Sequence, residues 1–225
     1  MDKSDLQDLI AKINTKENLA DSRETIRWKA LREAETLEDA DIFPMLREII
    51  TKNEGKGKAK REIRSAAYFI YGKLLKKTFR VEDCTFFIQR LNKETDKYSL
   101  TAILDRIKDL KYSNILLPPQ VDIAPILSLT RNENHHVRHG AILALSVCPG
   151  EESRKALAFY LAKEDEKAYQ YEIYYANIAM QTIGKPEDIP LLERSLKSRR
   201  PDLKITAQYA IQYIQEREMS DSVNH

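Results

Sequence analysis

Two histidines, His135 and His139, have the spacing that places two side chains on one face of a helix. Imidazole rings four residues apart on a helix can bind the same metal ion. His136 is adjacent and Glu133 is close, but the spacing indicates no third ligand. His135 and His139 are therefore weak candidates for a metal site, and we predict neither a metal nor another cofactor.

A second chemical feature is a local excess of positive charge. Residues 52–80 contain ten Lys and Arg against two Glu, although the net charge of the chain is only +2. Cations near the carboxyl end of a helix interact favourably with the helix dipole and keep the surface soluble, without any ligand. A dense group of them can also bind phosphate or an acidic protein. The candidate residues, called the basic patch below, are Lys56, Lys58, Lys60, Arg61, Lys73, Lys76, Lys77 and Arg80.

The sequence has no pattern typical of catalysis, since it lacks a Gly-rich phosphate loop, G-x-S-x-G, C-x-x-C and H-E-x-x-H. Cys84 and Cys148 lie among apolar neighbours in different repeats, which predicts reduced core thiols in a cytoplasmic protein. No run approaches the roughly 18–20 apolar residues that span a bilayer, and the start MDKSDLQDLIAKI is not a secretory signal. We therefore expect no contact with a membrane and favour a function without catalysis.

The elements that position these residues recur along the chain. Apolar anchors lie 37 residues apart at Ile26, Ile63, Leu100 and Val137, and Glu172 and Leu203 hold the same position later. A constant spacing in the range of about 20–50 residues indicates stacked repeats. A second pattern alternates with it, as DIFPML, DIAPIL and DIPLL, and places a proline in the first turn of a second helix. Each repeat thus consists of a helix A followed by a helix B.

These patterns predict one repeat domain over residues 1–225. Asp21 is the expected N-cap of the first helix A, and Gly184 the expected left-handed C′ residue after the fifth. The loop at 112–120 is long and has no assigned role. The expected segments are a cap helix at 2–14, repeats at 20–52, 56–93, 97–131, 134–163 and 166–197, a terminal helix at 201–216 and a frayed tail at 217–225.

The recurring pattern V/I-R-x-x-A-x-x-A, followed by a turn and D-I-x-P, resembles HEAT repeats, especially the short HEAT-like units of the phycobilisome-lyase type. The resemblance covers residues 20–216. It implies an all-α protein, a right-handed armadillo-like superhelix (α-solenoid) of about five HEAT-like hairpins with an N-terminal cap helix. It also implies that the arginine after the anchor, present as Arg27, Arg64 and Arg138, pairs with carboxylates or carbonyls of neighbouring repeats.

Tyrosines crowd the last repeats, at Tyr169, Tyr171, Tyr174, Tyr175, Tyr209 and Tyr213. They could form a contact surface for a partner, since tyrosine binds with little loss of entropy. They could also seal the open end of the repeat array, and we favour sealing.

The predicted function is a non-catalytic scaffold or adaptor that binds another protein through a concave face lined by the B helices. Mixed polar chemistry on that face suits a protein partner better than a phosphate backbone. The candidate partner-binding residues are Arg47, Gln89, Arg90, Ser128 and Arg194.

Two alternatives stay open. The first is a nucleic-acid-binding HEAT-like protein that uses residues 52–80 and resembles the alkylpurine DNA glycosylases in architecture, although Trp28 is the only tryptophan and no W-x-x-x-D pattern occurs. The second, suggested by the lyase-type resemblance alone, is help in attaching a bilin chromophore.

Overall fold

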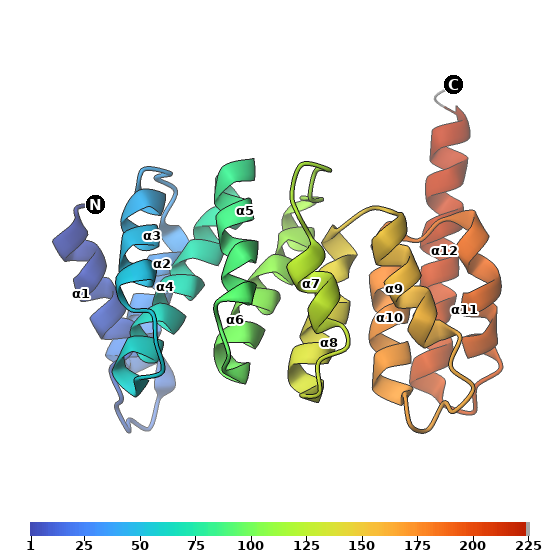
Figure 1. The fold of residues 1–225 in the computed structure, drawn as a ribbon, viewed down its shortest axis with the longest axis horizontal. Helices are drawn as coiled ribbons and strands as arrows, with labels where there is room; N and C mark the ends of the chain where they lie inside the picture. The colour runs from blue at the N-terminus through green and yellow to red at the C-terminus, as the bar shows by residue number, and fades with distance from the viewer. Residues whose placement is uncertain (224–225) are drawn as a thin grey trace. The chain divides into compact units, whose positions relative to one another are not determined.

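A computed structural model of the chain describes residues 1–223, and these residues form helices and turns without a strand (Figure 1). The backbone divides into two compact units, residues 1–109 and the residues from 110 onward. The fold class is all-α with repeated helix pairs, as the sequence predicts.

The first unit contains α1 (Lys3–Ile13), α2 (Ile26–Thr36), α3 (Ile42–Lys52), α4 (Lys58–Lys77), α5 (Val81–Gln89) and α6 (Lys97–Lys108). The second contains α7 (Ala124–Leu129), α8 (His135–Ala144), α9 (Glu151–Leu161), α10 (Gln170–Ile183), α11 (Ile189–Leu196) and α12 (Pro201–Val223). Short 3-10 helices lie at Ser22–Glu24, Arg90–Asn92, Asp109–Ser113, Leu145–Val147 and Pro186–Asp188.

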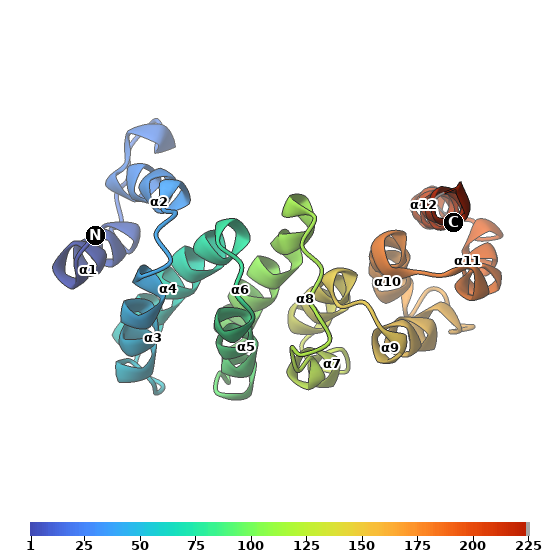
Figure 2. The ribbon, with the colours of Figure 1, turned by 90° about the horizontal axis from the view of Figure 1, so that it is seen from above.

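Helices in each unit pack against near neighbours in the chain and form two layers (Figure 2). In the first unit the layers are α1, α3, α5 and α2, α4, α6; in the second they are α7, α9, α11 and α8, α10, α12. The B helices α3, α7, α9 and α11 pack closely on the A helix that follows, whereas α5 contacts both α4 and α6. Helix α1 packs on α2 and α12 packs on α11, so four of the five B helices pair with the A helix that follows and not with the preceding one, as the A-then-B order would suggest.

Side-chain caps explain where several helices begin. Asn134 caps α8, its Oδ1 accepting from the backbone N–H groups of His136 at 3.1 Å and Val137 at 3.4 Å. Asp21 instead caps the short 3-10 helix before α2, and the hydroxyl of Thr25 caps α2 itself. The expected N-cap at Asp21 is therefore wrong, because an extra helical turn separates it from α2.

The two cores differ in chemistry. In the first unit the ring of Tyr71 stacks on Phe87, with centroids 5.0 Å apart, and contacts Phe43 at 4.7 Å. In the second unit, the A helices α8, α10 and α12 carry fully buried alanines, whose small side chains allow the helices to approach closely. These are Ala141, Ala144, Ala176, Ala179, Ala207 and Ala210. Cys84 and Cys148 are both buried as thiols, as predicted.

The last helix is longer than expected. Helix α12 continues to Val223, beyond the predicted end at 216, and residues 224–225 of the predicted tail lie outside the described residues. The Arg217 guanidinium donates to the carbonyls of Gln181 at 2.5 Å and Gly184 at 2.8 Å. A cation on the last carbonyls of α10 stabilises that helix end and holds this part of α12 in place.

Gly184 has a φ of −63°, so the expected left-handed geometry is wrong. The glycine is required for space, since a Cβ there would lie 2.6 Å from the Met180 carbonyl oxygen and 2.7 Å from Ile214 Cδ1. Among the residues that the structure describes, no helix combines the length and apolar character needed to cross a membrane.

Candidate protein-binding surfaces

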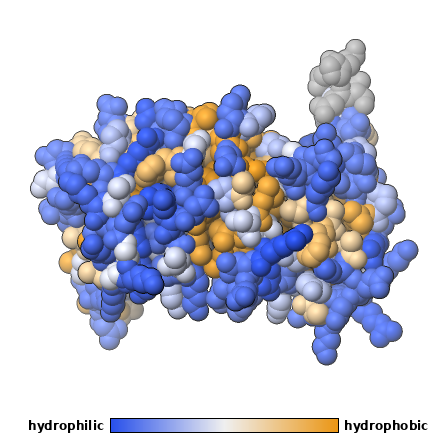
Figure 3. All heavy atoms as spheres, in the orientation of Figure 1, coloured by the Kyte–Doolittle hydropathy of each residue, from blue (hydrophilic) through white to orange (hydrophobic). Residues whose placement is uncertain are grey.

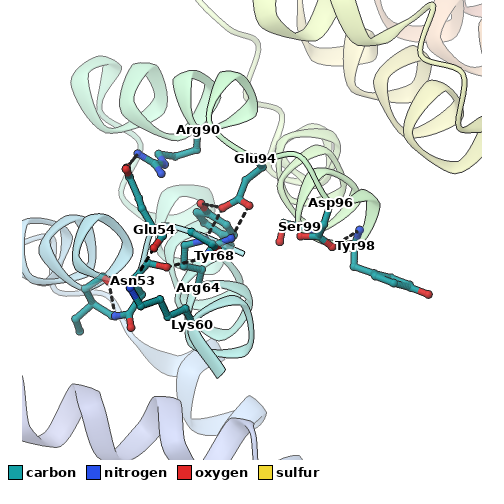
Figure 4. A network of polar contacts seen from close by, with 12 residues as sticks. Asn53, Glu54, Lys60, Arg64, Tyr68, Arg90, Glu94, Asp96, Tyr98 and Ser99 are labelled. Carbon is teal, nitrogen blue, oxygen red and sulfur yellow. Dashed lines mark hydrogen bonds and ion pairs between the residues drawn. The ribbon is translucent and has the colours of Figure 1, made fainter. Parts of the chain in front are cut away.

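The arginine that follows the apolar anchor is a structural residue in α4. Arg64 Nε and Nη2 donate to the two carboxylate oxygens of Glu94 at 2.6 and 2.7 Å (Figure 4). Its Nη1 donates to the carbonyls of Asn53 at 2.6 Å and Gly55 at 3.0 Å, and the Tyr68 hydroxyl donates to Glu94 at 2.6 Å. The side chains of Arg64 and Glu94 are only 5% and 3% exposed. The network therefore joins the loops that contain Gly55 and Glu94 to α4, and it is not open to an external anion.

The same arrangement recurs in the second unit. Arg138 Nε donates to Glu172 at 2.7 Å, and its Nη1 donates to the carbonyls of Asn132 at 2.7 Å and Glu133 at 3.2 Å. Glu172 takes the place of an apolar anchor because it accepts from this arginine. Burial opposes ionisation of Glu172, but hydrogen bonds from Arg138 and His139 lower the pKa of its carboxyl. The predicted structural role is confirmed for Arg64 and Arg138.

Arg27, at the same repeat position on α2, behaves differently. Its side chain is exposed, and it forms no ion pair with another residue in the described part of the chain. Ile26 beside it is 45% exposed, although its position predicts a core anchor, whereas Ala30 and Ala34 are buried. Helix α2 therefore turns its anchor positions toward solvent and packs on α1 and α4 through its alanines.

The basic patch lies in the first unit, and part of it is neutralised within the fold. Hydrophilic residues also cover most of the surface over α1 to α3 on the face seen in Figure 3. Three ion pairs join Lys73 to Glu35 at 2.8 Å, Lys77 to Glu38 at 3.0 Å and Arg80 to Asp83 at 2.6 Å. Lys56, Lys58 and Lys60 are exposed around the start of α4, and Arg61 is half-buried. Intervening carboxylates interrupt the continuous positive surface that a phosphate backbone would need.

The predicted partner-binding residues of the first unit are not equally accessible. Arg47 pairs with the buried Asp83, and its guanidinium lies 5.1 Å from the ring centroid of Phe86. Arg90, expected on the exposed row, is only 6% exposed and pairs with Glu54 at 2.8 Å. That expectation is wrong for Arg90 because its guanidinium is held against the fold by Glu54 and by the ring of Phe86. Gln89 is exposed.

In the second unit, Ser128 and Arg194 are exposed as expected. The Ser128 hydroxyl donates to the Pro125 carbonyl of its own helix at 2.9 Å, and Arg194 Nη1 donates to the Ala162 carbonyl at 3.2 Å. Both side chains therefore have local partners and still face solvent.

The rings of His135 and His139 lie close together, with centroids 5.6 Å apart. His139 Nε2 lies 3.2 Å from Glu172 and next to Arg138, whose charge would repel a cation. Burial lowers the pKa of His139, although the contact with Glu172 favours its charged form. In the described part of the chain, no three His, Cys, Asp or Glu side chains are grouped so that they could hold a metal ion.

Four half-exposed apolar side chains of the second unit lie on α10 and α12. Tyr171 is 52% exposed, Ile205 50%, Tyr209 50% and Tyr213 45%. The three residues on α12 are four apart and so form one stripe, and Tyr171 projects from the adjacent α10 with Arg200 5.9 Å from its ring centroid. We call Tyr171, Ile205, Tyr209 and Tyr213 the tyrosine surface.

The interpretation of these tyrosines as a seal is wrong for Tyr171, Tyr209 and Tyr213. The end of the unit is covered instead by the opposite side of α12, which buries Leu203, Ala207, Ala210 and Ile214. The sequence could have shown this. At helical spacing, Ile205, Tyr209 and Tyr213 lie on a different face of the helix from the buried Leu203, Ala207, Ala210 and Ile214.

No protein-family description matches this chain, and no curated protein matches its sequence. Among solved structures, the fold is similar to that of two designed armadillo repeat proteins. One is 13% identical with a TM-score of 0.46, over 93% of this chain and 99% of that chain. The other, computationally designed for modular peptide recognition, is 14% identical with a TM-score of 0.48, over 92% of this chain and 99% of that chain.

Proposed function

We propose that this chain is a helical-repeat scaffold that binds another protein, with the tyrosine surface of the second unit as a principal contact. The observation that carries the proposal is the stripe of half-exposed Ile205, Tyr209 and Tyr213 on α12. Large apolar side chains grouped on a surface often mark interaction sites, and tyrosine is enriched among residues that dominate binding energy.

A second surface for the same function is the B-helix row predicted from the sequence. It comprises Arg47 and Gln89 in the first unit, and Ser128 and Arg194 in the second. Arg90 does not belong to it, because its guanidinium is buried.

The finer classification is also proposed. The repeated arginine contacts of Arg64 and Arg138 support HEAT-like units, of which the phycobilisome-lyase type is one candidate. The buried thiols of Cys84 and Cys148 support a reducing compartment, and we propose the cytoplasm.

Site-specific photocrosslinking tests the tyrosine surface. A photoreactive phenylalanine analogue replaces Tyr209 in one variant and the exposed Lys155 of α9, outside the surface, in a matched control. We expect discrete protein adducts in cell lysate from position 209 only, reduced at least about tenfold by I205S and Y213S together, since removing a central contact of about 1.4 kcal/mol has that effect.

Circular dichroism of each variant confirms that it is folded. Adducts of equal yield at both positions would contradict the proposed surface. Adducts that disappear after nuclease treatment would favour nucleic-acid binding instead.

A further inference from the structure

A pocket of about 270 Å³ lies in the first unit, away from the tyrosine surface. The A helices α2, α4 and α6 supply most of its lining, including Arg27, Leu31, Phe69 and Arg106. The volume is below that of sites that hold a whole small molecule, which are about 300–1,000 Å³. A single side chain of a partner is a better match for this size.

Arg27 brings an uncompensated charge to the pocket. The arginines at the same repeat position, Arg64 and Arg138, are both engaged by a buried carboxylate. Arg27 has no carboxylate within ion-pair distance in the described part of the chain, and it lines the pocket from α2. Asp105, which also lines the pocket, is paired with Lys108 at 2.9 Å.

Arg106 supplies a second guanidinium that is already held in position. Its aliphatic stem lies against Gly72, where an added Cβ would be 2.3 Å from Arg106 Cβ. Its guanidinium carbon lies 5.5 Å from the ring centroid of Phe69, and Nη2 is 3.3 Å from Asp109. A cation fixed by such contacts loses little side-chain entropy on binding an anion.

We propose that this pocket binds an acidic side chain from an extended segment of a partner protein. The carboxylate would bind between the guanidinium groups of Arg27 and Arg106, and an apolar neighbour in the same segment would contact Leu31 and Phe69. The combination of two cations with apolar walls favours a single carboxylate beside an apolar neighbour over a phosphate backbone, which would need a continuous row of cations. The proposal goes beyond the proposed function, because the pocket and the tyrosine surface lie in different units.

A library of short random peptides displayed on phage, selected on the full chain, provides the probe. We expect enrichment of peptides that combine Glu or Asp with an aliphatic or aromatic residue. Fluorescence anisotropy with a selected peptide should then show at least about tenfold weaker binding to R27E, a loss of about 1.4 kcal/mol. R27K should retain part of the affinity, since it keeps the charge but not the planar fork.

Lys29→Glu is the matched control, because Lys29 is exposed on the same helix and does not line the pocket. It makes the same charge change and should leave peptide binding within about twofold of the original, since surface charges away from a site contribute little. Thermal unfolding by circular dichroism verifies that both variants are folded. The variant carrying I205S, Y209S and Y213S should bind the peptide unchanged, which separates this proposal from the tyrosine surface.

Three results would overturn the proposal. They are selected peptides without acidic enrichment, equal affinity of R27E and the original chain, and equal weakening by R27E and K29E. A single-stranded oligonucleotide that binds more tightly than the selected peptides and is lost in R27E would also overturn it, in favour of nucleic acid.

Discussion

At the scale of single residues, one repeat position carries arginines with different tasks. Arg64 is enclosed with Glu94 and Tyr68, whereas Arg27 is exposed on α2. The difference follows from the neighbours of each helix, because a guanidinium leaves water only where carbonyls and a carboxylate replace its hydration.

Arg64→Ala should therefore be strongly destabilising. The substitution leaves the Glu94 carboxylate buried without its cation, which costs about 3–5 kcal/mol. Arg27→Ala is the matched control and should change the free energy of unfolding by less than about 0.5 kcal/mol, as exposed substitutions do. Urea denaturation followed by circular dichroism measures both. Equal effects would mean that the enclosed ion pair has no special role.

The histidine in the second unit predicts a pH dependence. Burial lowers the pKa of His139 in the folded chain below the value of about 6.5 in the unfolded chain. Protons therefore bind the unfolded state first as the pH falls through about 6.5, and the free energy of unfolding decreases from there down to the folded pKa.

His139→Gln should remove this part of the pH dependence, because its amide does not titrate. Urea denaturation at several pH values from about 8 to about 5.5 measures the slope while carboxyl groups stay ionised. An unchanged slope in the variant would assign the effect to other groups. His139 is surrounded by Glu172, Arg138, His135, Tyr171 and Tyr175, so the variant also tests whether Glu172 stays in place.

At the scale of helices, close packing of neighbouring helices depends on Gly72 in the first unit and Gly184 in the second. Gly72→Ala should destabilise the fold by about 1–3 kcal/mol through overpacking against Arg106, which outweighs the gain of about 1 kcal/mol in helix propensity. Gly57→Ala at the N-cap of the same helix is the control for crowding, since its Cβ would meet nothing closer than 4.0 Å and only the small N-cap preference for glycine is lost. Thermal unfolding compares the two, and equal melting temperatures would show that Arg106 moves aside freely.

The sequence predicts the helices well because apolar spacing reports which face of a helix is buried. It cannot report which of two neighbouring helices covers that face, so the pairing of α3, α7, α9 and α11 with the following A helix was not predictable. The end of α12 was missed for a related reason. Its polar residues carry no stripe, and the contacts of Arg217 with Gln181 and Gly184 join positions more than 30 residues apart.

The candidate sites were less predictable than the fold. Composition placed Lys73 and Arg80 in the basic patch but gave no sign that Glu35 and Asp83 would neutralise them. Likewise, nothing local distinguishes Arg27 from Arg64, because the deciding carboxylate of Glu94 lies 30 residues after Arg64, in the loop before α6.

At the scale of the whole molecule, the division into two compact units predicts two unfolding transitions. Trp28 is the only tryptophan and lies in the first unit, so its fluorescence follows that unit alone, whereas circular dichroism follows both. Gly72→Ala should shift the fluorescence transition to lower urea. Gly184→Ala crowds Ile214 in the second unit. It should move the unfolding transition of that unit, followed by circular dichroism, to lower urea and leave the fluorescence transition unchanged. Coincident shifts in both variants would indicate a single cooperative unit.

The enclosed sulfur atoms have a practical consequence for spectroscopy. Burial, with the neighbouring Asp83 carboxylate, raises the pKa of the Cys84 thiol to about 12, and Cys148 is equally shielded from solvent. Maleimide reagents attack the thiolate, so neither native site should react while the chain is folded. A cysteine introduced at an outward-facing position could therefore carry a spin label or dye without first removing the natural pair.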